Sequence, residues 1–239
     1  MARDLRPVWV QLAGGSGVRF GGTLPKQFRR LGRKPVLVYA VETFLELYPE
    51  GIVIVVLPLA HFRYGERLLR KAFPHAALYL TVGGPTRSGS TEAALTLLED
   101  LELLSQEYVM AFHDAVRPFV SKEVIKRAIE AGAESGAAVC GIPVSFSVRL
   151  VEGEASHAIP RNRVWEVQTP QVFRGDILRE AWRRLSPLSD ESFTDEGSWV
   201  EAAGFTVRLV AGEPQNLKLT YPMDWEVARS WLKRQKTSS

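Results

Sequence analysis

A glycine-rich segment with two cations is the part of the sequence best suited to chemistry. Glycines cluster between Gly14 and Gly22, directly after an apolar run, and Arg19 and Lys26 lie within and after the cluster. Residues without side chains let the backbone turn sharply and bring its N–H groups against phosphate oxygens. Cationic side chains add charge-assisted hydrogen bonds to the same oxygens. The segment therefore predicts a nucleoside triphosphate site; the alternative is a surface turn with solvated cations.

The glycine spacing differs from two common phosphate-binding motifs. A P-loop requires Gly-Lys-Ser or Gly-Lys-Thr after four spacer residues, and the segment lacks it. In a dinucleotide fingerprint the third glycine would stand at Phe20, but it comes one residue later, at Gly21. Two cations also suit a triphosphate better than the less charged pyrophosphate of a dinucleotide. We therefore expect a nucleoside triphosphate rather than a nicotinamide cofactor.

A second group of polar residues follows an apolar run that ends at Phe112. His113, Asp114 and Arg117 come directly before Pro118, and we expect His113 and Asp114 to stand in a loop. Ligands of parallel sheets bind at the carboxyl ends of strands, so Asp114 is a candidate for binding a metal or a substrate. The alternative is an ion pair between Asp114 and Arg117 that closes a turn. For His113 the pattern favours a structural hydrogen-bonding role over that of a base.

Two further segments carry candidate residues. The stretch 161–171 contains Arg161 and Thr169, and it can also be interpreted as a structural turn with a core tryptophan. The stretch 216–224 places Lys218 between apolar neighbours, which predicts a strand end with the lysine on one face. Considered alone, that stretch favours a strand with a solvated lysine.

These candidates stand between alternating extended and helical patterns. Residues 52–57 are β-branched and wholly apolar, the pattern of a strand buried on both faces. Residues 35–48 repeat apolar side chains at helical spacing. The predicted strands cover residues 7–13, 52–57, 77–82, 108–112, 137–144 and 205–210, and the predicted helices cover residues 35–48, 62–73, 90–104, 121–135, 175–184, 195–203 and 222–233. This alternation predicts an α/β fold with a mostly parallel, twisted sheet flanked by helices on both faces.

The alternation is interrupted by residues 144–168. Short alternating apolar runs flank a polar turn at residues 152–156, which predicts a β-hairpin arm that leaves the sheet. An arm of this size cannot bury both of its faces alone, so we expect it to contact a second copy of the chain. The remaining sequence shows no repeat or linker, and residues 1–239 are therefore expected to form a single domain.

Composition limits the class of protein. The 239 residues carry a net charge of +3 and one cysteine, Cys140, which is typical of a small core residue and excludes an intrachain disulfide. The mild positive charge is spread along the chain and favours acidic small molecules over nucleic acid as partners. The longest apolar run, residues 52–60, is too short to span a bilayer, and the first residues lack the apolar core of a signal peptide. We therefore expect a cytoplasmic protein with no membrane partner.

Taken in order, these segments resemble the 2-C-methyl-D-erythritol 4-phosphate cytidylyltransferase family of the isoprenoid pathway. The resemblance runs from residue 8 to about residue 228. The motifs that carry it are Ala13-Gly-Gly-x-Gly-x-Arg19 with Pro25-Lys-Gln-Phe28, Gly83-Gly84 with Arg87 and Ser90, His113-Asp-Ala-x-Arg-Pro118, Gln168-Thr-Pro-Gln-x-Phe173, Thr194-Asp-Glu196 and Asn216-x-Lys-x-Thr220. The resemblance implies a Rossmann-like nucleotidyltransferase fold, CTP as substrate, Mg²⁺ as cofactor and a homodimer with interlocked arms.

The resemblance also implies roles for individual residues. Arg19, Lys26 and Lys218 would bind the triphosphate and stabilise the transition state. The nucleotide site would further include Ala13, Gly14, Gly15, Gly83, Gly84 and Ser90. The acceptor, a polyol phosphate, would be held by Asp114, Arg117, Ser147, Arg161 and Thr169, some of them from the neighbouring subunit. Asp114 would also steer the metal.

Two residues depart from the family pattern. Phe146 stands where the family usually carries Asp beside a hydroxyl-bearing residue, and Pro85 stands where some members have an acid near the ribose. The expected reaction is transfer of CMP from CTP to 2-C-methyl-D-erythritol 4-phosphate with release of pyrophosphate. The alternatives are a ribitol-5-phosphate cytidylyltransferase, because that family shares most of the motifs, and a catalytically weakened nucleotide-binding relative.

Overall fold

A seven-stranded sheet forms the centre of the molecule. The computed structural model describes residues 6–15, 24–186 and 193–237, and the strands of its main sheet follow the order β11-β7-β10-β6-β1-β4-β5. These strands are β1 (Arg6–Leu12), β4 (Ile52–Leu57), β5 (Ala77–Val82), β6 (Tyr108–Asp114), β7 (Ala137–Pro143), β10 (Trp165–Arg174) and β11 (Arg208–Ala211). Only β10 runs antiparallel to its neighbours, β6 and β7, among these seven strands. The predicted mostly parallel α/β fold is confirmed.

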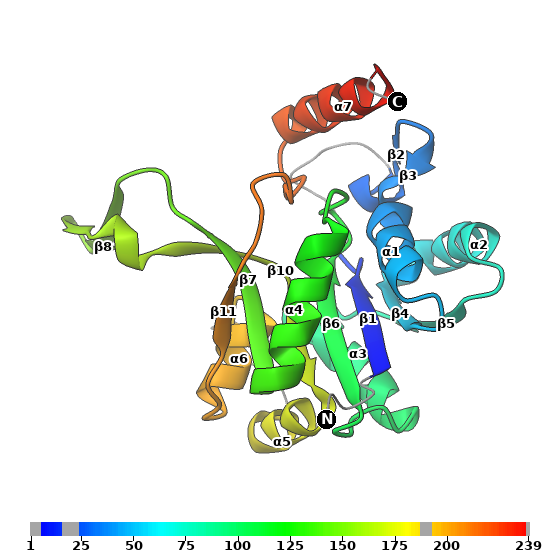
Figure 1. Ribbon diagram of the computed structural model, residues 1–239, viewed down its shortest axis with the longest axis horizontal. Coiled ribbons are helices and arrows are strands. Elements are labelled where there is room, and N and C mark those ends of the chain that lie inside the picture. The colour runs from blue at the N-terminus through cyan, green and yellow to red at the C-terminus, as the bar shows by residue number, and fades with distance from the viewer. Residues whose placement is uncertain (1–5, 16–23, 187–192, 238–239) are drawn as a thin grey trace.

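Helices cover both faces of this sheet, as Figure 1 shows. They are α1 (Val36–Leu47), α2 (Phe62–Ala72), α3 (Arg87–Asp100), α4 (Lys122–Ser135), α5 (Gly175–Leu185), α6 (Glu196–Ala202) and α7 (Pro222–Thr237). Successive strand residues point to opposite faces, so Trp9 packs with α1, α2 and α4, whereas Val8 and Val10 pack with α3, α5 and α6. The apolar run of β4 is buried on both faces for the same reason. Among the described residues, no helix combines the length and the apolar character needed to cross a membrane.

Shorter elements complete the chain. Two hairpins lie outside the main sheet, β2 (Arg30–Leu31) with β3 (Lys34–Pro35) and β8 (Val148–Glu152) with β9 (Ala155–Ile159). Single 3-10 turns are η2 (Lys26–Phe28), η3 (Leu59–His61) and η4 (Arg161–Arg163).

The β8–β9 hairpin projects from the body of the molecule, as Figure 1 shows. The predicted arm is thus present, but the predicted range 144–168 was too long at its end, because residues 165–168 belong to β10 and pair with β7 in the main sheet. Apolar side chains on and beside the hairpin face solvent: Phe146 is 81% exposed and Val151 is 67% exposed. Exposed apolar side chains on neighbouring residues mark a surface suited to contact with another protein.

Several predicted boundaries were wrong, and each has a local cause. Helix α3 begins at Arg87 rather than Ser90, because the Thr86 hydroxyl caps it by accepting a hydrogen bond from the Gly89 N–H. That helix ends at Asp100 rather than Leu104 because Glu102 adopts a left-handed conformation with φ of 57°.

The ends of two predicted strands were also wrong. His113 and Asp114 are the last residues of β6 rather than part of a loop, because they pair with Gln11 and Leu12 of β1. Strand β11 starts at Arg208, three residues later than predicted, and Lys218 lies in an irregular segment rather than at a strand end. Because β1, β4, β5 and β6 are parallel, their carboxyl ends lie at one edge of the sheet, where ligands of such folds bind.

Candidate active site

A cavity of about 350 Å³ opens at this edge of the sheet. Its walls come from the end of β1, the turn η2, the connection from β5 into α3, the end of β6 and the segment before α7. The lining residues are Leu12, Ala13, Gly14, Gly15, Lys26, Gln27, Gly84, Pro85, Thr86, Arg87, Ser90, Asp114, Val116 and Lys218. Segments that are far apart in the sequence thus build one concave surface, the usual form of a small-molecule site.

The first part of the glycine loop is held by a buried glutamine. The Gln27 side-chain amide donates to the carbonyl oxygens of Ala13, at 2.8 Å, and of Gly15, at 2.7 Å. Gln27 is only 2% exposed, and it stands beside Lys26 in η2. The same turn therefore holds the backbone of residues 13–15 and places Lys26 at the cavity.

Close backbone contacts require the glycines of the opposite wall. A Cβ atom on Gly14 would stand 2.6 Å from Ser90 Oγ, and one on Gly83 would stand 2.8 Å from the same atom. A Cβ on Gly84 would meet the backbone of Gly89 at 2.8 Å. Ser90 is buried and donates to the Thr86 carbonyl oxygen at 3.0 Å. The lack of side chains at these three glycines therefore lets β1, the β5–α3 connection and α3 pack closely beside the cavity.

The first turn of α3 faces this cavity through Thr86, Arg87 and Ser90. Backbone N–H groups at the start of a helix lack intrahelical partners, and the helix dipole adds positive potential there. Together with the Lys26 ammonium, this helix end gives the cavity a surface suited to an anion.

Asp114 is the only carboxylate that lines the cavity among the residues the structure describes. Its Oδ2 atom lies 2.8 Å from Lys218 Nζ and 3.7 Å from Arg117 Nε, and its Oδ1 atom lies 3.8 Å from Arg87 Nη2. Burial by itself would raise the pKa of Asp114, but the cations of Lys218, Arg87 and Arg117 outweigh it and hold that pKa well below its usual range. Asp114 is therefore a fixed negative charge within a group of cations.

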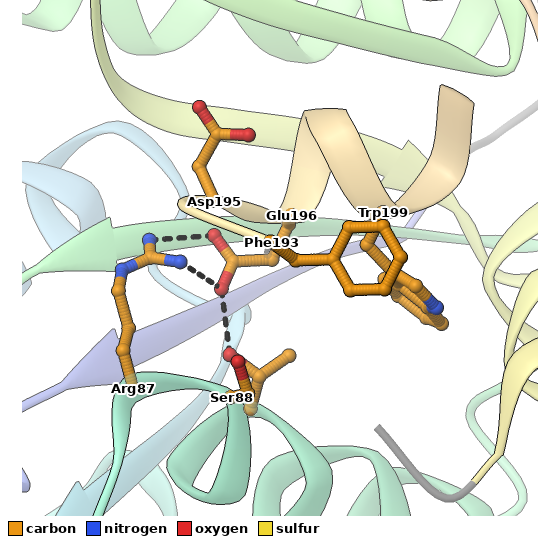
Figure 2. Close-up of a pocket in the computed structure, with 7 residues that line it drawn as sticks. Arg87, Ser88, Phe193, Asp195, Glu196 and Trp199 are labelled. Atoms are coloured by element: carbon orange, nitrogen blue, oxygen red, sulfur yellow. Dashed lines mark hydrogen bonds and ion pairs between the residues drawn. The ribbon is translucent and has the colours of Figure 1, made fainter. Parts of the chain in front are cut away.

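Arg87 joins this carboxylate to a second one. It makes a two-pronged ion pair with Glu196, with N–O distances of 2.8 and 2.7 Å. Burial would lower the pKa of Arg87, but the Glu196 and Asp114 carboxylates raise it above its ordinary value. Figure 2 shows Arg87 and Glu196 facing each other between the start of α3 and the start of α6. The guanidinium is therefore permanently charged.

His113 lies directly behind Asp114 and is fully buried. The Thr169 hydroxyl lies 3.1 Å from the Asp114 backbone N–H and 3.1 Å from His113 Nδ1, while His113 Nε2 lies 3.0 Å from the Arg117 carbonyl oxygen. Because a carbonyl oxygen can only accept, the ring proton stands on Nε2, and the Thr169 hydroxyl donates to Nδ1. Burial lowers the pKa of His113 to about 4. These contacts confirm the structural role predicted for His113.

Lys218 reaches Asp114 because its irregular segment is held against the end of β6. The Leu219 N–H donates to the Val116 carbonyl oxygen at 2.8 Å, and Arg117 donates to the Asn216 carbonyl oxygen at 2.8 Å. Asn216, which is fully buried, donates to the Thr169 carbonyl oxygen at 2.6 Å. The segment 216–219 therefore depends on contacts with the turn that follows β6 and with β10 rather than on a regular strand.

The predicted site residues fall into four groups. Those that line the cavity are Ala13, Gly14, Gly15, Lys26, Gly84, Ser90, Asp114 and Lys218. Gly83, Arg117 and Thr169 lie directly behind this lining, as the contacts above describe. Ser147 and Arg161 are exposed on the arm and are not among the lining residues of this chain's cavity. Arg19 lies outside the described residues.

Comparison with known proteins agrees with this geometry. A profile of the family described as IspD, 2-C-methyl-D-erythritol 4-phosphate cytidylyltransferase, matches residues 8–234. The chain belongs to the IspD family. A 2-C-methyl-D-erythritol 4-phosphate cytidylyltransferase from Thermosipho melanesiensis is 39% identical over 218 residues, which are 91% of this chain and 93% of the relative.

Solved structures of IspD proteins share the fold. The crystal structure of a 4-diphosphocytidyl-2C-methyl-D-erythritol synthase matches with a TM-score of 0.78 at 26% identity, and the match covers 95% of this chain and 98% of that one. The 2-C-methyl-D-erythritol 4-phosphate cytidylyltransferase from Thermus thermophilus matches with a TM-score of 0.70 at 30% identity, over 96% and 99% of the two chains. The Rossmann-like nucleotidyltransferase fold is therefore confirmed for this IspD chain.

Sequence reasoning assigned no role to three residues that shape this IspD site. Gln27 and Arg87 line the cavity, and Glu196 holds Arg87 from behind. A signal existed for each. Gln27 directly follows Lys26, Arg87 closely follows the paired glycines at residues 83–84, and Glu196 ends the motif at residues 194–196.

The depressed pKa of His113 predicts a pH dependence of stability. Unfolded chains take up a proton on histidine below about pH 6.5, whereas folded His113 stays neutral down to about pH 4. The free energy of unfolding should therefore fall as pH is lowered through this window, by at most about 1.4 kcal/mol per pH unit from this residue. Urea unfolding at pH 7, 6, 5 and 4.5 measures the slope. His113→Gln should flatten it, whereas the exposed His75→Gln should not; an unchanged slope in His113→Gln would contradict the assignment.

Proposed function

We propose that this IspD chain transfers CMP from CTP to 2-C-methyl-D-erythritol 4-phosphate and releases pyrophosphate. The observation that carries the proposal is the single cavity in which Lys26, Lys218 and the start of α3 surround the glycine loop. Its potential suits a polyphosphate, and the IspD relatives carry the same activity in their names. The ribitol 5-phosphate alternative is not favoured by those relatives.

The reaction joins two phosphates and needs no strong base. An oxygen of the acceptor's phosphate monoester attacks the α-phosphorus of CTP, the bond from that phosphorus to the bridging oxygen breaks, and pyrophosphate leaves with the electron pair. The attacking monoester is already largely dianionic near neutral pH, so it does not require deprotonation. This agrees with His113, which is buried, hydrogen-bonded and neutral.

Fixed positive charge must then lower the barrier. Two anions have to approach each other, and negative charge develops on the leaving pyrophosphate. Lys26 and the α3 N-terminus would bind the triphosphate, together with Arg19 from the same glycine loop. Lys218 would complete this set, since an ammonium has three donors and its ion pair with Asp114 occupies one. These groups act by electrostatic stabilisation in a geometry set before substrate binds.

The glycine wall would accept the nucleoside. Gly14 and Gly83 lie against each other and against Ser90, and Gly84 lies against the Gly89 backbone, so closely that a Cβ atom would not fit. A planar base or a ribose can approach such a backbone surface and form hydrogen bonds with its peptide groups. Ala13 and Gly15 continue the same surface toward the phosphates.

Asp114 fits a supporting role for Mg²⁺. Magnesium in nucleotide enzymes is commonly held by one or two carboxylates together with substrate phosphates, and Asp114 is the one carboxylate among the described lining residues. No group of three or more His, Cys, Asp or Glu side chains suited to a metal occurs among the described residues. Mg²⁺ would be held by Asp114 together with CTP phosphates, and when bound it would neutralise phosphate charge.

The acceptor site would be completed by a second copy of the chain. Arg117 and Thr169 support Asp114, whereas Ser147 and Arg161 lie on the arm, away from the lining of this chain's cavity. Phe146 and Val151 give the arm an exposed apolar surface suited to a partner subunit. In a homodimer with exchanged arms, each arm would bring Ser147 and Arg161 to the partner's cavity.

Pyrophosphate release from CTP tests the function directly. The purified protein with Mg²⁺ and CTP is offered 2-C-methyl-D-erythritol 4-phosphate or ribitol 5-phosphate separately. Fast release with the first acceptor supports the proposal. Preference for the second acceptor, or CTP binding without release for either one, would overturn it and would favour a ribitol enzyme or a non-catalytic relative.

Lys26→Ala should lower turnover by about 100-fold, because one fixed cation at a developing charge contributes on the order of 3 kcal/mol to the barrier. Steady-state pyrophosphate release measures the rate, and thermal unfolding checks that the variant is folded. The exposed Lys122, which pairs with Glu46 on the surface, is the matched control, and Lys122→Ala should keep full turnover. Near-normal turnover of folded Lys26→Ala would rule out its assigned role.

Arm exchange predicts complementation between two defective variants. Lys26→Ala damages the cavity and Arg161→Ala damages the arm, so a mixed dimer contains one site with both defects and one intact site. Dissociated and re-annealed equal mixtures should recover about a quarter of wild-type turnover, because half of the dimers are mixed. Each variant re-annealed with itself is the control. No recovery, with mixed dimers verified by differential tags, would show that Arg161 serves its own chain's cavity.

A further inference from the structure

The motif Thr194-Asp195-Glu196 has no role in the mechanism above, yet its last residue is among the most buried charges of the chain. Glu196 is 1% exposed and is the first residue of helix α6. Apart from Lys218, the residues that line the cavity lie far from it in the sequence. Burial of a carboxylate is costly unless its oxygens are paired and hydrogen-bonded. The contacts of Glu196 therefore indicate what this charge is for.

We propose that Glu196 is a positioning residue: it holds the Arg87 guanidinium at a set distance from Asp114 and thereby keeps the Asp114 carboxylate oriented toward Lys218. This inference rests on the proposed cytidylyl transfer and adds one residue to it. Glu196 itself touches neither the cavity nor, by this proposal, any substrate.

Both Glu196 oxygens are occupied. Oε1 accepts from Arg87 Nη1 at 2.8 Å and from the Thr91 hydroxyl at 2.6 Å, and Oε2 accepts from Arg87 Nη2 at 2.7 Å. Figure 2 shows these contacts at the labelled Arg87 and Glu196. A two-pronged pair fixes the plane of the guanidinium as well as its distance. Arg87 therefore cannot rotate without breaking two hydrogen bonds.

The base of Glu196 is also held. Asp195 caps α6 by accepting from the Ser198 N–H at 2.8 Å, and the Gly197 N–H donates to Gln171 Oε1 at 2.8 Å. Gln171 belongs to β10, which pairs with β6, the strand that ends at Asp114. Strand β10, which holds the start of α6, and strand β6, which ends at Asp114, are therefore neighbours in one sheet.

Arg87 stands between two carboxylates at unequal distances. Its Nη2 atom is 2.7 Å from Glu196 and 3.8 Å from Asp114, which is too long for a hydrogen bond. Without the Glu196 charge, the guanidinium would move onto Asp114 and compete with Lys218 for that carboxylate. Glu196 therefore restrains Arg87 and leaves the 2.8 Å contact between Lys218 and Asp114 intact.

Glu196→Gln tests this role, because it keeps the shape of the side chain and removes its charge. We expect kcat/KM for the acceptor to fall about tenfold, since the Asp114 orientation is lost. CTP should bind as tightly as in the wild type or more tightly, because the cavity becomes more positive while Lys26 and the glycine loop are unchanged. Damage to the fold would weaken both substrates together, so the two readouts separate positioning from structural support. Titration calorimetry gives the CTP Kd.

Asp195→Asn is the matched control. It removes one carboxylate from the neighbouring residue, also close to Arg87, and asparagine caps helices as well as aspartate does. Because Asp195 forms its capping bonds within α6, the variant should keep wild-type kcat/KM and thermal stability. A tenfold loss in Asp195→Asn would indicate that general charge or α6 integrity, rather than the Glu196–Arg87 pair, sets the rate.

A double-variant cycle decides whether Glu196 acts through Arg87. In an Arg87→Met background, adding Glu196→Gln should change kcat/KM by less than about twofold, because the restrained group is gone. A further tenfold loss in that background, or wild-type kinetics of folded Glu196→Gln, would overturn the proposal. If Glu196→Gln does not fold, Arg87→Lys keeps the charge but loses the planar fork, and it should give the same tenfold loss.

The wild-type reaction is measured first and separates the two claims. An inactive wild-type protein would overturn the proposed function and this inference together. An active wild type with an unaffected Glu196→Gln variant would overturn the inference alone.

Discussion

The site depends on one buried carboxylate that stays charged. Asp114 forms a 2.8 Å ion pair with Lys218, and the guanidinium groups of Arg117 and Arg87 lie 3.7 and 3.8 Å away. An ionised carboxylate away from water is stable only when such partners surround it. The requirement is mutual, because the three cations gathered around this carboxylate would repel one another without it. One negative charge therefore draws the β5–α3 connection, the end of β6 and the segment before α7 to one point.

The sheet explains why these segments can meet. Strand β6 is paired on both sides, with β1 parallel and β10 antiparallel, so its last residue has a set position. Behind it, His113 and Thr169 fix the backbone of Asp114 by hydrogen bonds that cross from β6 to β10. Asn216 then attaches the segment of Lys218 to Thr169. The polar contacts form a continuous path from the core of the sheet to the cavity, so substrate binding need not create the arrangement.

Local patterns were enough to predict most of the fold. The apolar runs of β1 and β4 reflect strands buried on both faces, and the periodic spacing of α1 reflects a helix buried on one face. The structure confirmed these two strands and this helix at the predicted positions. The glycines were also informative, since the Ser90 side chain leaves no room for a Cβ at Gly14 or Gly83. Boundaries failed where a single hydrogen bond decides them, as at the Thr86 cap of α3.

The site could be predicted only as far as its parts are local in sequence. Gly14 and Lys26 belong to one glycine-rich sequence motif, and both line the cavity. The pairing of Arg87 with Glu196, by contrast, joins residues 109 positions apart. Nothing near either residue specifies the other, because the contact arises from the packing of α6 beside α3. The contact of Lys218 with Asp114 could not be predicted for the same reason. It depends on a segment held by Asn216 rather than on the predicted strand.

These long-range contacts are suited to phosphate transfer. A reaction that needs a base requires a group that gains and loses a proton near neutral pH, whereas the pKa values of three groups in this site are displaced away from neutrality. That of His113 is lowered to about 4, that of Asp114 is held below its usual range and that of Arg87 is raised. Each group therefore keeps one charge state across the physiological range. A site of constant charges cannot move protons well, but it can stabilise charge that shifts from an attacking phosphate to a leaving pyrophosphate without reorganising itself.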